Sequence, residues 1–261
     1  MLNGCPSEAG KDRDDFLFEE IKSGKADFSY STITSSFSDH KAEFYVFSDA
    51  LKIDSVRINV SAELQQKIAD SLDCMLLTAR LADMIWIQKD CTIKPLPRLI
   101  SSSTVSMIAH SQSIDNELAK FGTEPKLIST VGKHWIVDND LAWHIGRAIN
   151  YGWHFANNDF VGPTEYSVSK DEAGKQIKMI QGRGWGHDIH HVDYSQTCVL
   201  VSNQCKLDGN LIDLKTLLGN NVSCNLASHQ GPLKIFRQSG TQIFPKLNAY
   251  KDKISQCSPD V

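Results

Sequence analysis

Two segments in the second half of the chain decide the fold: INYGWHF, residues 149–155, and HHVDYSQTCVLVS, residues 190–202. Both are rich in aromatic and β-branched residues, a composition typical of strands. Similar pieces lie between residues 126 and 202, separated by turn-forming stretches such as DND and KDEAG. The pattern predicts a mainly antiparallel β-sheet.

In the first half of the chain, two short strand-like runs at residues 42–47 and 56–60 lead into predicted helices. Ser61 and Thr78 are capping residues that precede apolar residues at helical spacing, and a third helix is predicted from Ser103 to Lys120. Helices gathered early and strands gathered late are typical of an α+β protein with N-terminal helices packed on the sheet. We expect a polar N-terminal arm at residues 1–40 and a single α+β domain at residues 41–261, helical over about 61–122 and β-rich over about 126–261.

The composition is that of an ordinary globular protein. The chain has 261 residues, of which 41% are hydrophobic and 22% charged, with a formal net charge of −4. Nucleic-acid binders need a concentrated basic face, and none is seen, so no nucleic-acid partner is expected. No apolar run reaches the roughly 18 to 20 residues that cross a bilayer, so no membrane partner is expected either. Composition leaves the oligomeric state open.

The cysteines and the N-terminal sequence leave the compartment open. The chain has seven cysteines, an odd number, so at least one thiol stays unpaired in a monomer. Cys198 and Cys205 are close enough to staple a hairpin, and Cys224 or Cys257 are alternative partners for either one. A cytoplasmic location fits the sequence, as does a periplasmic or extracellular one after removal of a leader.

The segment GRGWGHDIHHVDYSQTCVLVS, residues 182–202, carries most of the candidate chemistry. It holds three histidines within five positions. In a strand, alternation would place His191, Asp193 and Ser195 on one face, opposite an apolar face. The alternative is an ordinary surface strand whose polar face has no functional role.

Residues 149–155 repeat this arrangement. Alternation would place their aromatic side chains in the core and His154 on the opposite face. If the two strands are neighbours, His154 converges with His191 and Asp193 on one concave patch. His187 would then reach in from the glycine-rich loop, whose glycines permit close approach to a ligand.

Several strings resemble the signature of a group of uncharacterised bacterial proteins that are often exported. They are INYGWH at 149–154, IQ at 180–181, the HxxxxVDYS pattern at 187–195 and CMLLT at 74–78. The resemblance covers about residues 50–203 and implies no activity. At the position of His191 the group usually has an aromatic residue, so the resemblance favours the other candidates: His154, His187, Asp193 and Tyr194.

Hydrolysis is the predicted function. The ordinary pKa of histidine suits proton transfer near neutral pH, and a carboxylate partner fixes the tautomer of the imidazole. We expect a hydrolase that acts on a polymer such as a glycan or peptidoglycan fragment. The candidate catalytic residues are His154, His187, Asp193, Tyr194 and Ser195, and the candidate substrate-binding residues are Lys133, Trp153 and Trp185.

Alternative chemistries remain open. A thiol hydrolase would use Cys74, which precedes the predicted helix at Thr78. A metal-dependent oxygenase of the Fe/2-oxoglutarate type would use zinc or iron as cofactor, with His187, His191 and Asp193 as ligands. A non-catalytic carbohydrate-binding protein is favoured by the five tryptophans, because exposed tryptophan suits stacking on a small-molecule or glycan-type ligand.

Overall fold

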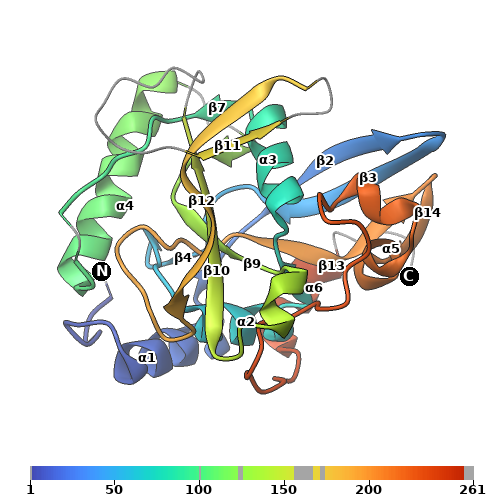
Figure 1. Ribbon diagram of the computed structural model, residues 1–261. Coiled ribbons are helices and arrows are strands. Elements are labelled where there is room, and N and C mark those ends of the chain that lie inside the picture. The colour runs from blue at the N-terminus through green and yellow to red at the C-terminus, as the bar shows by residue number, and fades with distance from the viewer. Residues whose placement is uncertain (1, 100, 123–125, 156–166, 171–173, 256–261) are drawn as a thin grey trace.

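The computed structural model describes residues 2–99, 101–122, 126–155, 167–170 and 174–255. Helices pack against mainly antiparallel sheets, which confirms the predicted α+β class (Figure 1). Strand β7 (Cys91–Thr92) pairs in parallel with β8 (Ile128–Ser129), and two isolated bridges, Leu77 to Ile136 and Lys133 to Gln196, are also parallel. None of the helices in the described ranges has the length and apolar character that crossing a membrane requires.

One of the two larger sheets has the strand order β14-β13-β3-β2, with β6 added beside β13. It is joined at one end by the β13–β14 hairpin, in which Asp208 and Gly209 form the two-residue turn, with positive φ angles of 52° and 83°. This is the conformation that a tight hairpin turn favours. The strands are β2 (Tyr30–Phe37), β3 (His40–Phe47), β6 (Cys74–Leu76), β13 (Leu200–Leu207) and β14 (Asn210–Asp213).

The other large sheet has the order β11-β12-β10-β9 and carries the candidate chemistry. Its long central pair is antiparallel and irregular, with register shifts on either side of Asn150. Such shifts are β-bulges, which re-aim side chains. The strands are β9 (Lys133–Ile136), β10 (Arg147–His154), β11 (Ser167–Lys170) and β12 (Gln176–Asp188).

The predicted helices form where the capping residues place them. The Ser61 and Thr78 hydroxyls accept hydrogen bonds from the backbone N–H groups of Leu64 and Leu81, each at 3.1 Å. Helix α3 lies between the two large sheets, and α4 lies on the other side of the β10–β12 sheet (Figure 1). The longer helices are α1 (Lys11–Lys22), α2 (Ala62–Ser71), α3 (Ala79–Gln88) and α4 (Thr104–Leu118).

Short elements complete the described chain. Strands β1 (Ala26–Asp27), β4 (Lys52–Ile53) and β5 (Val56–Arg57) form a small sheet in the order β1-β4-β5. The remaining helices are α5 (Leu214–Gly219) and α6 (Lys251–Ser255), with 3-10 turns η1 (Ala119–Phe121), η2 (Asn139–Ala142), η3 (Ser223–Leu226) and η4 (Asn248–Tyr250).

The first forty residues do not form the polar arm that their composition predicts. Helix α1 buries Leu17 and Ile21 completely, and β2 pairs with β3 along its whole length. Ile33 of β2 is fully buried, while Thr32, Thr34 and Ser36 supply the solvent-facing positions of a half-buried strand. A strand whose polar positions are Ser and Thr lacks the strong apolar signal that a sequence analysis relies on.

The segment from His191 to Thr197 does not form the predicted strand: Tyr194 and Ser195 lie in a turn, and Gln196 and Thr197 make isolated β-bridges. The Asp193 carboxylate accepts hydrogen bonds from both the backbone N–H and the hydroxyl of Ser195, and the Asp193 N–H donates to the Gln196 side chain. These local bonds satisfy the N–H groups of Asp193 and Ser195, while Gln196 and Thr197 hydrogen-bond to Val60 and Lys133 instead of continuing β13. Strand β13 therefore begins only at Leu200, and the expected alternation of faces does not apply here.

Gly132 illustrates how tightly this turn packs against β9. A Cβ atom at Gly132 would overlap the carbonyl oxygen of Ser195 and lie 2.6 Å from the Oγ1 atom of Thr197. We expect Gly132→Ala to lower the free energy of unfolding by about 2 kcal/mol, because a packed turn must move. Gly186→Ala is the matched control, since nothing lies within 4 Å of its Cβ position. Urea unfolding curves that are equal for the two variants would contradict this packing.

Candidate functional site

A buried carboxylate, Asp83 of α3, is the centre of a cluster of polar side chains. Its Oδ1 atom lies 2.8 Å from the Tyr151 hydroxyl and 2.7 Å from Nε2 of His154, and its Oδ2 atom lies 3.1 Å from Nε2 of His229. Asp83 and His154 are each 2% exposed. The His229 side chain is 33% exposed, so it links the buried carboxylate to the solvent.

Strand β10 supplies two of the three partners through a break in its alternation. Gly152 and Trp153 have positive φ angles, 105° and 59°, and the second value is rare for a bulky residue. As a result Tyr151 and His154 both point toward Asp83, while Trp153 points the other way and packs against His110 of α4. The predicted opposition of Tyr151 and His154 on two faces is therefore wrong.

The third partner is held in place by the start of α3. The Thr78 hydroxyl donates to the carbonyl of Ala227, and the Arg80 guanidinium donates to the carbonyl of Leu226 at 3.3 Å. These bonds fasten the segment that follows η3 onto the helix that carries Asp83. His229 is thus positioned by the same capping residue that begins α3.

The hydrogen bonds fix the ionisation of Asp83. Burial by itself raises the pKa of Asp83, but the bonds from His154, His229 and Tyr151 outweigh burial and hold this pKa well below its usual range. An ionised carboxylate only accepts hydrogen bonds, so both imidazoles must carry their proton on Nε2. For a neutral His229 this leaves Nδ1 unprotonated and able to accept a proton.

Two neighbours keep the His154 side of the cluster rigid. The indole of Trp86 stacks on the His154 ring at 5.9 Å between centroids, and its N–H donates to the carbonyl of Phe155 at 3.0 Å. His134 of β9 is buried nearby, and burial, together with the charge of His154, lowers its pKa to about 3. His134 therefore stays neutral at physiological pH.

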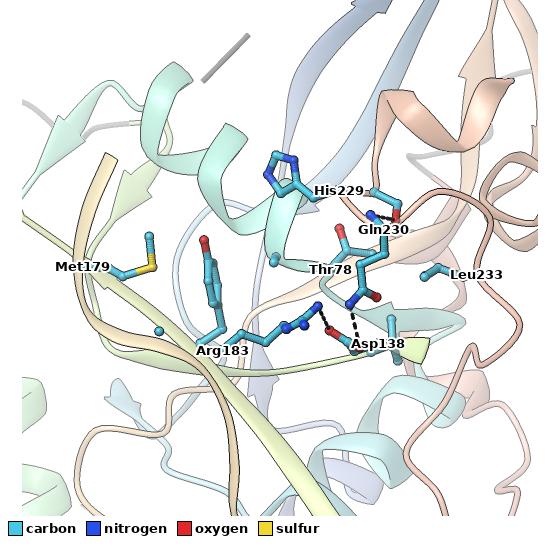
Figure 2. A pocket seen from close by; sticks show the side chains of 12 residues that line it. Thr78, Asp138, Met179, Arg183, His229, Gln230 and Leu233 are labelled. Carbon is cyan, nitrogen blue, oxygen red and sulfur yellow. Dashed lines mark hydrogen bonds and ion pairs between the residues drawn. The ribbon is translucent and has the colours of Figure 1, made fainter. Parts of the chain in front are cut away.

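A cavity of about 300 Å³ opens beside the cluster. His229 and Tyr151 line it, and Arg183 and Asp138 form another part of its wall (Figure 2). The remaining lining residues are Thr78, Ala79, Val137, Met179, Gly182, Ser228, Gln230 and Leu233. The cavity therefore combines one solvent-accessible imidazole, one guanidinium and an apolar floor.

The charged guanidinium in the wall of the cavity is paired with two carboxylates. Arg183 lies 3.2 Å from Asp138 Oδ2 and 3.2 Å from Asp140 Oδ2, and Gln230 donates to Asp138 Oδ1 at 2.9 Å (Figure 2). Burial raises the pKa of Asp138, while its bond from the Asp140 backbone and the charge of Arg183 act in the opposite direction. The site has no excess positive charge that would select a strongly anionic ligand.

The sequence-predicted site residues divide into two groups. His154 belongs to the Asp83 cluster, whereas His187 and His191 stack on each other at 3.9 Å. In the β10–β12 pairing His154 is opposite Met179 and His187 is opposite Ala148. Six residues of strand, about 20 Å, separate these positions, so His154 does not converge with His187 as expected.

The second group is centred on Asp193, which is 7% exposed. Its carboxylate lies 3.4 Å from the Lys133 amine, and burial, which raises the pKa, is outweighed by this charge and by the bonds from Ser195. Ser195 is fully buried with its hydroxyl bonded to Asp193. The Tyr194 hydroxyl accepts a hydrogen bond from the backbone of Arg98 at 2.7 Å. Catalytic roles for these residues stay predictions.

The two predicted substrate-binding tryptophans differ in exposure. Trp153 is 2% exposed and packs against His110 and Tyr194, so it is part of the interior. Trp185 is 40% exposed and stacks on His144.

The structure does not support the metal and thiol alternatives. Among the described residues no group of three or more His, Cys, Asp or Glu side chains is arranged to hold a metal ion, and this includes the candidates His187, His191 and Asp193. Cys74 lies inside β6 and is buried, with the Tyr30 hydroxyl 3.2 Å from its sulfur. Cys198 and Cys205 are free thiols, and so is Cys224, so the structure forms none of the expected bridges among these three; Cys257 lies outside the described residues.

Sequence reasoning missed the central residue of the site. Asp83 lies in LADMIWI, an apolar stretch of α3 that reads as a buried helix face. The one carboxylate on this apolar face is the signal that could have identified the site, because a buried charge requires hydrogen-bonding partners elsewhere in the fold. Arg183 and Asp138 carried no local signal, since their pairing joins positions 45 residues apart.

Comparisons with known proteins do not extend this description. The chain matches no protein-family model, no curated protein and no solved structure. The site is therefore interpreted from its geometry and chemistry.

The low pKa of Asp83 predicts a pH-dependent contribution to stability. Because the folded-state pKa lies below the unfolded value of about 3.9, ionised Asp83 stabilises the fold above about pH 4, and this is lost as the pH falls through the folded-state pKa. We expect Asp83→Asn to lower the free energy of unfolding by about 3 kcal/mol at pH 7 and by about 1 kcal/mol less at pH 3, because pH 3 lies below the unfolded value but above the folded-state pKa. Denaturant titrations at the two pH values measure this.

Asp39→Asn is the control for the same titrations, since Asp39 is exposed at the β2–β3 turn. We expect this variant to match the unmodified protein at both pH values. An Asp83→Asn variant that is as stable as the control at pH 7 would show that the buried carboxylate has no stabilising partners.

Proposed function

We propose that the protein is a hydrolase in which His229, oriented by Asp83, activates a water molecule in the adjoining cavity. The observation that carries the proposal is the pairing of a buried, ionised carboxylate with a partly exposed imidazole at the wall of a cavity. A carboxylate that orients a histidine is the recurring arrangement of general-base catalysis.

The tautomer of His229 determines how the proton moves. Nε2 donates to Asp83, so Nδ1 accepts a proton from water as the water oxygen attacks the electrophilic carbon of the substrate. The imidazolium that forms is stabilised by the Asp83 charge. It then returns the proton to the leaving group, so the products are those of adding one water across the broken bond.

The geometry favours an acyl bond, an ester or an amide, over a glycosidic bond. Glycosidases commonly use two carboxyl groups on opposite sides of the scissile bond. Here Asp83 is enclosed by its three partners, and Asp138 is paired with Arg183. A single imidazole with one carboxylate behind it suits activation of water for attack on a carbonyl.

His154 acts as a positioning residue in this proposal. It is 2% exposed and lies on the far side of Asp83 from the cavity-lining His229, so it does not reach the substrate. Its hydrogen bond to Oδ1 and that of Tyr151 hold the carboxylate so that Oδ2 faces His229. The cavity of about 300 Å³ has room for one reacting group of the predicted polymeric substrate, a glycan or peptidoglycan fragment, while the rest of the polymer stays outside.

The proposal predicts a large loss of activity on substitution of His229. The assays use p-nitrophenyl acetate and purified peptidoglycan sacculi, with release of nitrophenol, acetate and new amino groups as readouts. We expect His229→Gln to lower kcat by about 100-fold or more, because general-base catalysis contributes about that factor. We also expect the melting temperature to change by only about 3 °C, since His229 is partly exposed.

His190→Gln is the matched control, because this histidine is exposed and pairs only with Glu63 on the surface. It should keep the rate of the unmodified protein. Equal rates for His229→Gln and the control, or no release of any product by the unmodified protein, would overturn the proposed function.

A further inference from the structure

Aromatic residues lie at one end of the β10–β12 strand pair: Trp143 and His144 shortly before β10, and Trp185 near the end of β12. Trp143 is 83% exposed and Trp185 is 40% exposed. The imidazole of His144 stacks on the Trp185 indole at 4.6 Å between centroids, with 17° between the ring planes. We call Trp143, His144 and Trp185 the aromatic platform. Contiguous exposed apolar surface on a protein marks a site that binds a ligand or a partner.

The aromatic platform continues the wall of the cavity. Arg183 of β12 contacts Asp138 and Asp140, and Trp185, two residues further along β12, contacts His144. All three partners belong to one short segment, residues 138–144, so the side chains of Arg183 and Trp185 lie on the same side of β12. Arg183 and Asp138 line the cavity, and the aromatic platform therefore begins where the cavity ends.

We propose that the aromatic platform binds the sugar rings of a neutral glycan whose acyl group enters the cavity. This inference rests on the proposed function, since the cavity supplies the reacting group and the aromatic platform only holds the chain. A pyranose ring has a face of C–H groups that packs on an aromatic ring and a rim of hydroxyl groups that need polar partners. Asp140 and Arg183, at the edge of the aromatic platform, are such partners.

The charges around the aromatic platform favour a neutral glycan over other occupants. Arg183 is matched by two carboxylates, so an anionic polymer or an anionic lipid surface gains no net attraction. A purely apolar partner has no polar group that could hydrogen-bond with Asp140 or Arg183 at the edge of the aromatic platform. An N-acylated sugar chain meets both requirements, because it offers ring faces to the tryptophans and an amide carbonyl to the cavity.

The test measures binding of the N-acetylglucosamine hexamer by isothermal titration calorimetry. We expect the unmodified protein to bind it, and Trp185→Ala and Trp143→Ala to weaken binding about tenfold or more each, the loss typical of a buried aromatic anchor. Phe37→Ala is the matched control, since Phe37 is also 40% exposed but lies at the end of the β2–β3 hairpin (Figure 1). It should bind as the unmodified protein does.

The His229→Gln variant separates this inference from the proposed function. If His229→Gln binds the hexamer normally but hydrolyses no substrate, both proposals hold. If the unmodified protein binds the hexamer through the tryptophans yet shows no His229-dependent hydrolysis, the proposed function fails and the glycan site stands. Absence of hexamer binding, or equal binding by Trp185→Ala, Trp143→Ala and Phe37→Ala, overturns the aromatic platform whatever the hydrolysis assays show.

Discussion

The ionised carboxylate of Asp83 lies in the interior between α3 and β10, where a lone charge would cost several kcal/mol. Three donors offset that cost, and they come from two separate parts of the chain: Tyr151 and His154 from β10, and His229 from the segment after η3. One buried charge thus fixes the relative positions of a helix, a strand and a late loop. Residues from all three elements line the adjoining cavity.

The backbone of β10 carries the strain that this arrangement needs. Trp153 adopts a positive φ angle that costs about 1 to 3 kcal/mol for a non-glycine residue, and Gly152 next to it leaves room for the rings of His134 and His154. Without this break in alternation, Tyr151 and His154 would point to opposite sides of the sheet. Strain at a position that aims polar side chains at a cavity is characteristic of functional sites.

Local patterns predicted the helices and the fold class, while the site depended on long-range contacts. The caps at Ser61 and Thr78 and the Asp208–Gly209 turn act within a few residues, so the sequence reveals them. The strand expected over His191–Thr197 failed because the Asp193 side chain bonds its own backbone neighbours, and the face expected for His154 failed at a bulge. Asp83 was hidden because its partners are 68 to 146 residues away.

The protonation of the His229 ring tests the central claim most directly. Long-range ¹H–¹⁵N correlation spectra of ¹⁵N-histidine-labelled protein distinguish the two ring nitrogens, with His229→Gln supplying the assignment. The account predicts that neutral His229 carries its proton on Nε2, bonded to Asp83, and that Asp83→Asn changes this tautomer preference. A neutral His229 protonated on Nδ1 in the unmodified protein would contradict the account, because the unprotonated nitrogen would then be Nε2, which faces the Asp83 carboxylate, and Nδ1 could not take a proton from water.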